Sequence, residues 1–276
     1  MKPANSVASH GTQPNILVER RDGVAIVTLN RPNERNPLGL DLADHMLDIL
    51  EDLERDGNLH AVILTGAGSV FCAGAELGKV LHPDGIDSEQ QYLHLRGFSR
   101  VVQRVRDLDL PVIAAVNGAA VGGGAALALA CDIAIAAEGA SYYFAFGRVG
   151  AAGCDMGCSY FLPKLVGTIR AKHWLLTGAT IGAEQGRIEG LFVDICPRDQ
   201  LLGRALDIAA QIKIATPRRA AAITKLAVAR SEDADFQTCI AYETHLQNYL
   251  FTGDEHKIRL QSLLHRKIGA RPADSH

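Results

Sequence analysis

The order of β-rich and helical runs in the first half of the chain limits the folds open to it. Residues 24–29, 60–65 and 111–116 are short apolar runs, as expected of buried strands. Apolar residues recur at helical spacing over 38–53, and a second helix is predicted over 89–106. Strands that alternate with helices join through right-handed crossovers into a largely parallel sheet. We therefore predict an α/β protein.

Two further patterns complete this outline. Residues 16–19 and 24–29 flank Arg21, Asp22 and Gly23, and an Asp-Gly pair suits the tight turn of a β-hairpin. After about residue 159 the apolar spacing is mostly helical, with helices predicted over 169–176, 183–191, 200–214, 218–229 and 234–251. An α/β core is thus followed by a helical tail.

Composition argues against several function classes. The 276 residues carry a formal charge of −3, whereas proteins that bind nucleic acid or anionic membranes broadly have a basic excess. No run of about 18 uncharged apolar residues predicts a membrane span, and no basic and apolar leader predicts secretion. Six cysteines without a CxxC pair are typical of reduced thiols. We expect a cytoplasmic protein that binds neither nucleic acid, membrane nor metal.

Three segments contain the candidate chemistry: residues 71–77, residues 111–124 with their glycine triplet, and residues 150–167. Each has a plain structural explanation, because glycines often serve only a turn or close packing. The triplet lacks the Gly-Lys-Ser/Thr ending of a nucleotide-binding loop. It also lies mid-chain, whereas a dinucleotide-binding turn follows the first strand of its βαβ unit. The sequence therefore supports neither a nucleotide-binding loop nor a dinucleotide-binding turn.

Taken together, in this order and spacing, the three segments resemble the crotonase (enoyl-CoA hydratase/isomerase) superfamily. The resemblance covers nearly the whole chain and includes residues 30–38, with their Asn-Arg-Pro and Asn-Pro-Leu, and residues 177–191. It implies a spiral core of ββα units over 15–200 and a helical C-terminal trimerisation region over 201–276. Residues 1–14, which are mostly polar, are expected to form a flexible tail before this core. The resemblance also implies a homotrimer or hexamer. The apolar side chains of the helix predicted over 234–251 fit such an interface.

The resemblance implies an acyl-CoA thioester substrate and no cofactor besides the coenzyme A that the substrate contains. Chemistry next to a thioester puts negative charge on its oxygen, which two fixed backbone N–H groups can stabilise. By similarity, these donors are the amides of Ala75 and Gly123, the second at a helix N-terminus. The resemblance places the following residues at the substrate: Glu34, Arg35, Ala73, Ala75, Glu76, Leu77, Gly78, Gly122, Gly123, Ala126 and Phe146.

The chain departs from the pattern of the common hydratases at two positions. Those enzymes hold and activate water with two glutamates, one placed two residues after the glycine triplet and one before the next Gly-rich turn. Ala126 and Phe146 stand at these positions. Neither side chain can transfer a proton, so the two-glutamate mechanism is not supported.

Asp155 is the nearest remaining carboxylate, in a turn where several relatives with other chemistry place a catalytic aspartate. An aspartate beside an apolar acyl pocket can act as a general acid or base. The alternative is that Asp155 caps a helix that begins near Met156. Three reactions remain open: hydration, a double-bond shift, and hydrolysis or decarboxylation that breaks a carbon–carbon bond. The alternative from another class is a non-catalytic acyl-CoA-binding subunit.

The acyl pocket itself is expected between Val80, Leu81 and the region through Phe98. Tyr142 and Tyr143 lie on the strand before Phe146, and strand alternation predicts that one of them faces the pocket.

Overall fold

The computed structural model describes residues 14–82, 84–85 and 87–269. The predicted N-terminal tail therefore lies outside the described residues except for its last residue, Pro14. The end of the predicted C-terminal region, residues 270–276, also lies outside them.

The larger sheet begins with a hairpin. Strands β1 (Ile16–Arg21) and β2 (Val24–Leu29) pair antiparallel, and Asp22 and Gly23 turn the chain with φ of 52° and 84°. This confirms the predicted hairpin. The other strands run parallel in the order β1-β2-β3-β5-β7-β10 and are β3 (Ala61–Gly66), β5 (Val112–Val116), β7 (Ile133–Ala137) and β10 (Asp194–Cys196).

A second sheet contains shorter strands in the order β4-β6-β8-β9, namely β4 (Val70–Cys72), β6 (Ala119–Val121), β8 (Ser141–Tyr143) and β9 (Thr180–Gly182). The pairs β3/β4, β5/β6 and β7/β8 each place their first strand in the larger sheet and their second in the smaller one. Helical segments follow each pair. The chain therefore winds through repeated ββα turns, which confirms the predicted fold class.

Helices cover the sheets because each has an apolar face. In α1 (Leu42–Arg55), the buried residues include Leu42, Met46, Leu50 and Leu53, spaced at about one helical turn. Helix α2 (Ser88–Asp107) packs with its own apolar face, and the short α3 (Gly123–Leu129) is buried throughout. Small side chains let α3 lie in the interior of the fold.

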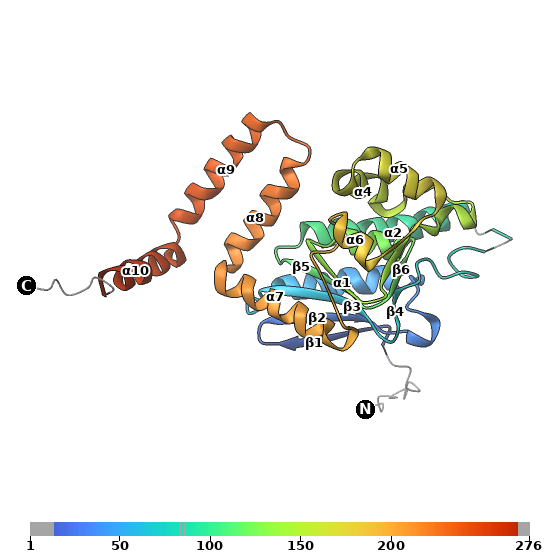
Figure 1. The fold of residues 1–276 in the computed structure, drawn as a ribbon, viewed down its shortest axis with the longest axis horizontal. Helices are drawn as coiled ribbons and strands as arrows, with labels where there is room; N and C mark the ends of the chain where they lie inside the picture. The colour runs from blue at the N-terminus through green and yellow to red at the C-terminus, as the bar shows by residue number, and fades with distance from the viewer. Residues whose placement is uncertain (1–13, 83, 86, 270–276) are drawn as a thin grey trace, which may run out of the picture.

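The remaining helices follow the last ββα turn. They are α4 (Cys158–Val166), α5 (Thr168–Thr177), α6 (Ala183–Ile188), α7 (Leu201–Ala215), α8 (Arg218–Ser231), α9 (Phe236–Phe251) and α10 (Asp254–Gly269). Figure 1 shows α8 and α9 beside one another and α10 beyond them, away from the sheets. In the part of the chain that the structure describes, no helix has the length and apolar character needed to cross a bilayer.

Two local expectations need correction. Leu38 does not belong to the first helix, which begins at Leu42. It forms an isolated parallel bridge with Ala75 instead. The region after residue 159 also contains two short strands, β9 and β10, which form because neighbouring strands offer unpaired backbone groups.

Candidate active site

A cavity of about 640 Å³ lies where the two sheets, α2 and the segment before α4 meet. Its wall comes from the loop after β4, the turn before α3, the 3-10 segments η2 (Ala145–Val149) and η3 (Asp155–Gly157), and one face of α2. The lining includes Leu38, Ala73, Ala75, Leu77, Val80, Leu81, Gln91, Phe98, Gly122, Gly123, Phe146, Arg148, Asp155 and Met156.

A close backbone contact brings the loop after β4 against the turn before α3. Gly74 has φ of +80°, and a Cβ added there would lie 2.6 Å from the carbonyl oxygen of Val121 and 3.5 Å from the nitrogen of Gly123. Only glycine accepts both the positive φ and this approach. Ala75 is thereby held beside Gly123.

The bridge at Leu38 orients the same loop. Leu38 N–H donates to the Gly74 carbonyl at 2.7 Å, and Glu76 N–H donates to the Leu38 carbonyl at 3.1 Å. The N–H groups of Ala75 and Gly123 donate to no protein acceptor within the described residues. Both residues line the cavity, so their N–H groups are the candidate backbone donors to a ligand there.

Glycine is also required on the α3 side of this contact. A Cβ on Gly123 would lie 2.8 Å from Met156 Sδ and 2.9 Å from Leu38 Cδ1. A Cβ on Gly124 would lie 2.5 Å from the Cys72 carbonyl oxygen. The glycine triplet thus lets the turn pack directly against the loop after β4 and against η3.

Glu76 does not line the cavity, and its predicted place beside the substrate stays a prediction. Its carboxylate accepts two hydrogen bonds from Arg31, at 3.0 Å and 2.8 Å, and pairs with Lys79 at 2.7 Å. The Arg31 hydrogen bonds, opposed by burial and helped by Lys79, lower the pKa of Glu76 to about 2. Arg31 also pairs with Glu34. Both glutamates therefore bind Arg31, and neither lines the cavity.

The other predicted substrate residues divide into two groups. Arg35 and Gly78 are exposed and lie outside the lining, although the Arg35 carbonyl accepts from Ala73 N–H at 2.9 Å. Ala126 is fully buried within α3 and does not reach the cavity. The structure does bring together on the wall Ala73, Ala75, Leu77, Gly122, Gly123, Phe146 and Asp155.

Asp155 lines the cavity and is partly buried. Burial raises the pKa of Asp155, while a hydrogen bond from Met156 N–H at 2.9 Å acts in the opposite direction. The helix-cap prediction is wrong, because α4 begins at Cys158 and its N-cap is Gly157, without a side-chain hydrogen bond. Met156, between Asp155 and Gly157, has φ of 49°, an unusual conformation that bends the chain before α4 begins.

Comparison with known proteins supplies the family. A family model described as enoyl-CoA hydratase/isomerase matches residues 19–267. The chain belongs to the enoyl-CoA hydratase/isomerase family. It is 33% identical over 238 residues to a 4-chlorobenzoyl coenzyme A dehalogenase from Arthrobacter, with 85% of each chain covered.

Two further matches extend over almost the whole length of the relative. A short-chain-enoyl-CoA hydratase from Clostridium acetobutylicum is 32% identical over 255 residues, which is 92% of this chain and 95% of the relative. The crystal structure of a putative enoyl-CoA hydratase from Streptomyces coelicolor superimposes with a TM-score of 0.87 and 30% identity, over 100% of this chain and 99% of that one. Different reaction names therefore occur among relatives of similar identity.

In this member of the enoyl-CoA hydratase/isomerase family, the two positions at which the common hydratases carry glutamates differ in their surroundings. Phe146 lines the cavity, with a ring carbon 3.7 Å from the place of a Gly122 Cβ, whereas Ala126 is enclosed by α3 and its neighbours. Among the described lining residues, Asp155 is the one carboxylate.

The apolar wall lies where it was predicted, with Val80, Leu81 and Phe98 lining the cavity. Neither predicted tyrosine lines it. Tyr142 is fully buried, with its ring centroid 4.7 Å from that of Phe192. Tyr143 lies under the guanidinium of Arg148, a lining residue that sequence reasoning missed because nothing in its local pattern distinguishes it from a solvated arginine.

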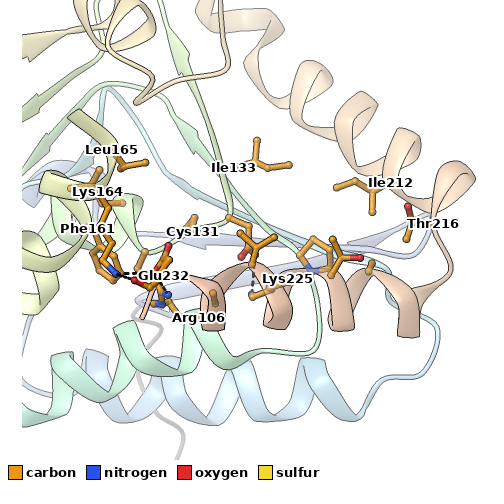
Figure 2. Close-up of a pocket in the computed structure, with 18 residues that line it drawn as sticks. Arg106, Cys131, Ile133, Phe161, Lys164, Leu165, Ile212, Thr216, Lys225 and Glu232 are labelled. Atoms are coloured by element: carbon orange, nitrogen blue, oxygen red, sulfur yellow. Dashed lines mark hydrogen bonds and ion pairs between the residues drawn. The ribbon is translucent and has the colours of Figure 1, made fainter. Parts of the chain in front are cut away.

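A second hollow, of about 500 Å³, lies between α8 and the core (Figure 2). Its interior cation, Lys225, pairs with Asp132 at 2.8 Å and donates to the carbonyls of Val105 and Leu110. These polar groups satisfy one another, so the hollow offers a ligand little to bind. Among the described residues, no group of three or more His, Cys, Asp or Glu side chains is placed to hold a metal ion.

Proposed function

We propose that this protein transforms an acyl-CoA thioester through an enolate-like anion. The N–H groups of Ala75 and Gly123 would hold the thioester oxygen, and Asp155 would move the proton. The observation that supports this proposal is that one cavity wall contains both unpaired amides and the carboxyl group of Asp155.

The backbone donors address the main energetic problem of this chemistry. Removing a proton beside a thioester carbonyl, or adding a nucleophile to a conjugated thioester, places negative charge on the carbonyl oxygen. In oxyanion holes, a preorganised donor contributes about 2.7–4 kcal/mol to the transition state. Apolar neighbours such as Leu38 and Met156 exclude water, which strengthens such hydrogen bonds.

A single carboxyl group suits a double-bond shift best. Asp155 would remove a proton from one carbon of the acyl chain, leaving the enolate on the thioester, and return the proton to another carbon. Its raised pKa makes the protonated form easier to hold between the two steps. Hydration would need the same carboxyl group to activate water as well, without a second acid on the wall.

The Arthrobacter relatives favour a second candidate, substitution on an aryl-CoA thioester. Here the Asp155 carboxylate would attack the ring carbon that bears a halogen, and halide would leave with the electron pair of its bond. Water would then hydrolyse the resulting aryl ester, which regenerates the carboxylate and releases a proton and the hydroxylated ring. The ring would pass its negative charge to the thioester oxygen, at the same two amides.

One experiment separates these reactions. The purified protein would be incubated in deuterium oxide with enoyl-, dienoyl-, β-oxoacyl- and 4-chlorobenzoyl-CoA, with mass spectrometry of each thioester and measurement of released chloride. A double-bond shift changes the chromatographic position without adding water, and deuterium enters only where the proton held by Asp155 exchanges with the solvent. Hydration adds water, substitution releases chloride, and carbon–carbon cleavage shortens or opens the acyl group.

The controls define the role of the carboxyl group. Asp155→Asn should remove turnover and retain thioester binding, whereas Asp48→Asn, an exposed aspartate on α1, should retain both. Thioester binding without turnover of any substrate would favour a non-catalytic acyl-CoA-binding subunit and contradict the proposal.

A further inference from the structure

Arg148 is a charged residue on the cavity wall for which the proposed reaction has no use. It lies on η2 and, with Asp155, makes up the charged side chains of the described lining. Within the described ranges, Arg148 forms no ion pair and donates no side-chain hydrogen bond. By contrast, Arg31 and Arg104 are each paired with a carboxylate.

The guanidinium of Arg148 is nevertheless held in place. Its central carbon lies 5.3 Å from the centroid of the Tyr143 ring, where the face of the aromatic ring attracts a cation. Stacking of this kind leaves the N–H donors at the guanidinium edge free. Arg148 is also exposed, so an approaching anion would not have to lose all of its water.

A plain hydrocarbon acyl group would make poor use of this arrangement. It would displace water from the guanidinium without replacing its hydrogen bonds, which is unfavourable. A carboxylate would accept two parallel N–H bonds from the same group, the geometry that arginine and carboxylates favour. Gln91, on the α2 wall, adds an uncharged polar side chain to the lining.

We propose that Arg148 is a specificity residue that selects thioesters whose acyl chain ends in a carboxylate. The inference rests on the proposed function, because the thioester must occupy this cavity. Asp155 and Arg148 form no ion pair with each other although both line the cavity, which leaves one for the reaction and the other for recognition of the chain end.

Calorimetric titration with matched thioesters tests this inference. Succinyl-, glutaryl- and adipoyl-CoA would be compared with butanoyl-, pentanoyl- and hexanoyl-CoA, and free coenzyme A would be titrated separately. At least one ω-carboxyl thioester should bind about ten-fold or more tightly than its uncharged partner. Arg148→Gln should abolish that preference and leave the affinity for uncharged thioesters and coenzyme A unchanged.

Two variants test how the guanidinium is held. Tyr143→Phe keeps the ring and should keep the preference, whereas Tyr143→Leu removes the ring and should weaken it. Arg219→Gln is the matched control, because Arg219 is also exposed and lies 5.6 Å over a tyrosine ring, that of Tyr249, outside the cavity lining. It should change none of the affinities.

The outcomes distinguish this inference from the function on which it rests. If uncharged thioesters bind but the carboxylated series shows no preference, the role of Arg148 is refuted and the proposed function stands. If Arg148→Gln weakens free coenzyme A and every thioester equally, Arg148 binds the phosphates of coenzyme A and the inference is wrong. If no thioester binds, the proposed function fails first.

Discussion

Asp155 combines a reactive position with a cost to stability. Its folded pKa is raised by burial, so the folded protein holds its proton more tightly than the unfolded chain does. Ionised Asp155 therefore destabilises the fold at pH values above its raised pKa, and this penalty disappears as the pH falls below the ordinary aspartate value of about 3.9. Such a cost is common where a residue serves chemistry.

We accordingly expect Asp155→Asn to stabilise the protein while it abolishes turnover. The gain in the free energy of unfolding should be full above the raised pKa and should vanish at about pH 3. Urea unfolding of both proteins across this pH range would measure it. A variant less stable than the wild type at neutral pH would contradict the assigned environment of Asp155.

Glu76 should show the opposite pH dependence, because its pKa is depressed, chiefly by Arg31, to about 2. Its stabilising contribution is complete above its unfolded pKa of about 4.3 and is lost as the pH falls through about 2. Glu76→Gln should cost about 2 kcal/mol at neutral pH, since among the described residues the poorly exposed Arg31 then keeps only the more exposed Glu34 as a charged partner. A difference in unfolding free energy that persists unchanged in strong acid would refute this account.

At the scale of elements, the contact between the loop after β4 and the turn before α3 determines where Ala75 and Gly123 lie. Two buried asparagines hold the turn between β3 and β4, which leads into that loop. Asn36 donates to the carbonyls of Ala67 and Val70, and Asn117 accepts from Gly66 N–H. These hydrogen bonds satisfy backbone groups of the turn and fix the start of β4, from which the loop continues.

Gly74→Ala should disrupt this contact. The new Cβ would lie 2.6 Å from a backbone oxygen, so the loop must move, and a shift of about 1 Å at a catalytic donor can cost roughly a hundred-fold in rate. Gly139→Ala is the matched control, because Gly139 also has positive φ but its added Cβ would meet nothing within 4 Å. Kinetics should show a loss for the first variant alone. Equal losses would indicate backbone strain rather than the contact.

The sequence predicted the long elements well and the local geometry of the site poorly. Helical spacing identified α1 and α2, because many apolar residues repeat the signal. The three-residue strands β9 and β10 were not predicted, since they form only when a partner strand is already present. The ion pair of Glu76 was not predicted for a similar reason, because its partner, Arg31, lies far away along the chain.

For the whole molecule, the C-terminal helices raise the question of assembly. No residue of α9 is buried, although this helix carries large apolar side chains. Those of Phe236, Ile240, Tyr249 and Phe251 are all exposed, Phe236 to 72%. Helix α8 is attached to the core, since its Lys225 pairs with Asp132, and Glu232, directly after its end, pairs with Arg106 of α2 (Figure 2). Because α8 is held in place and α9 leaves apolar side chains uncovered, these helices fit an interface between copies of the chain.

We therefore expect sedimentation velocity to show a homotrimer or hexamer. Introducing Phe236→Glu and Ile240→Glu together should shift the protein toward smaller species, because charges would replace buried apolar contacts. Gln237→Glu with Gln247→Glu adds the same charge to α9 at polar positions and should leave the assembly intact. A wild-type protein that sediments as a monomer at every concentration would rule out this interface.

The most direct test of the account is a crystal structure with a saturated, unreactive acyl-CoA thioester bound. We expect the thioester oxygen to accept hydrogen bonds from Ala75 N–H and Gly123 N–H, each about 2.7–3.1 Å long, with the carboxyl group of Asp155 facing the acyl chain. A thioester oxygen bound elsewhere, or amides that point away from each other in the complex, would contradict it.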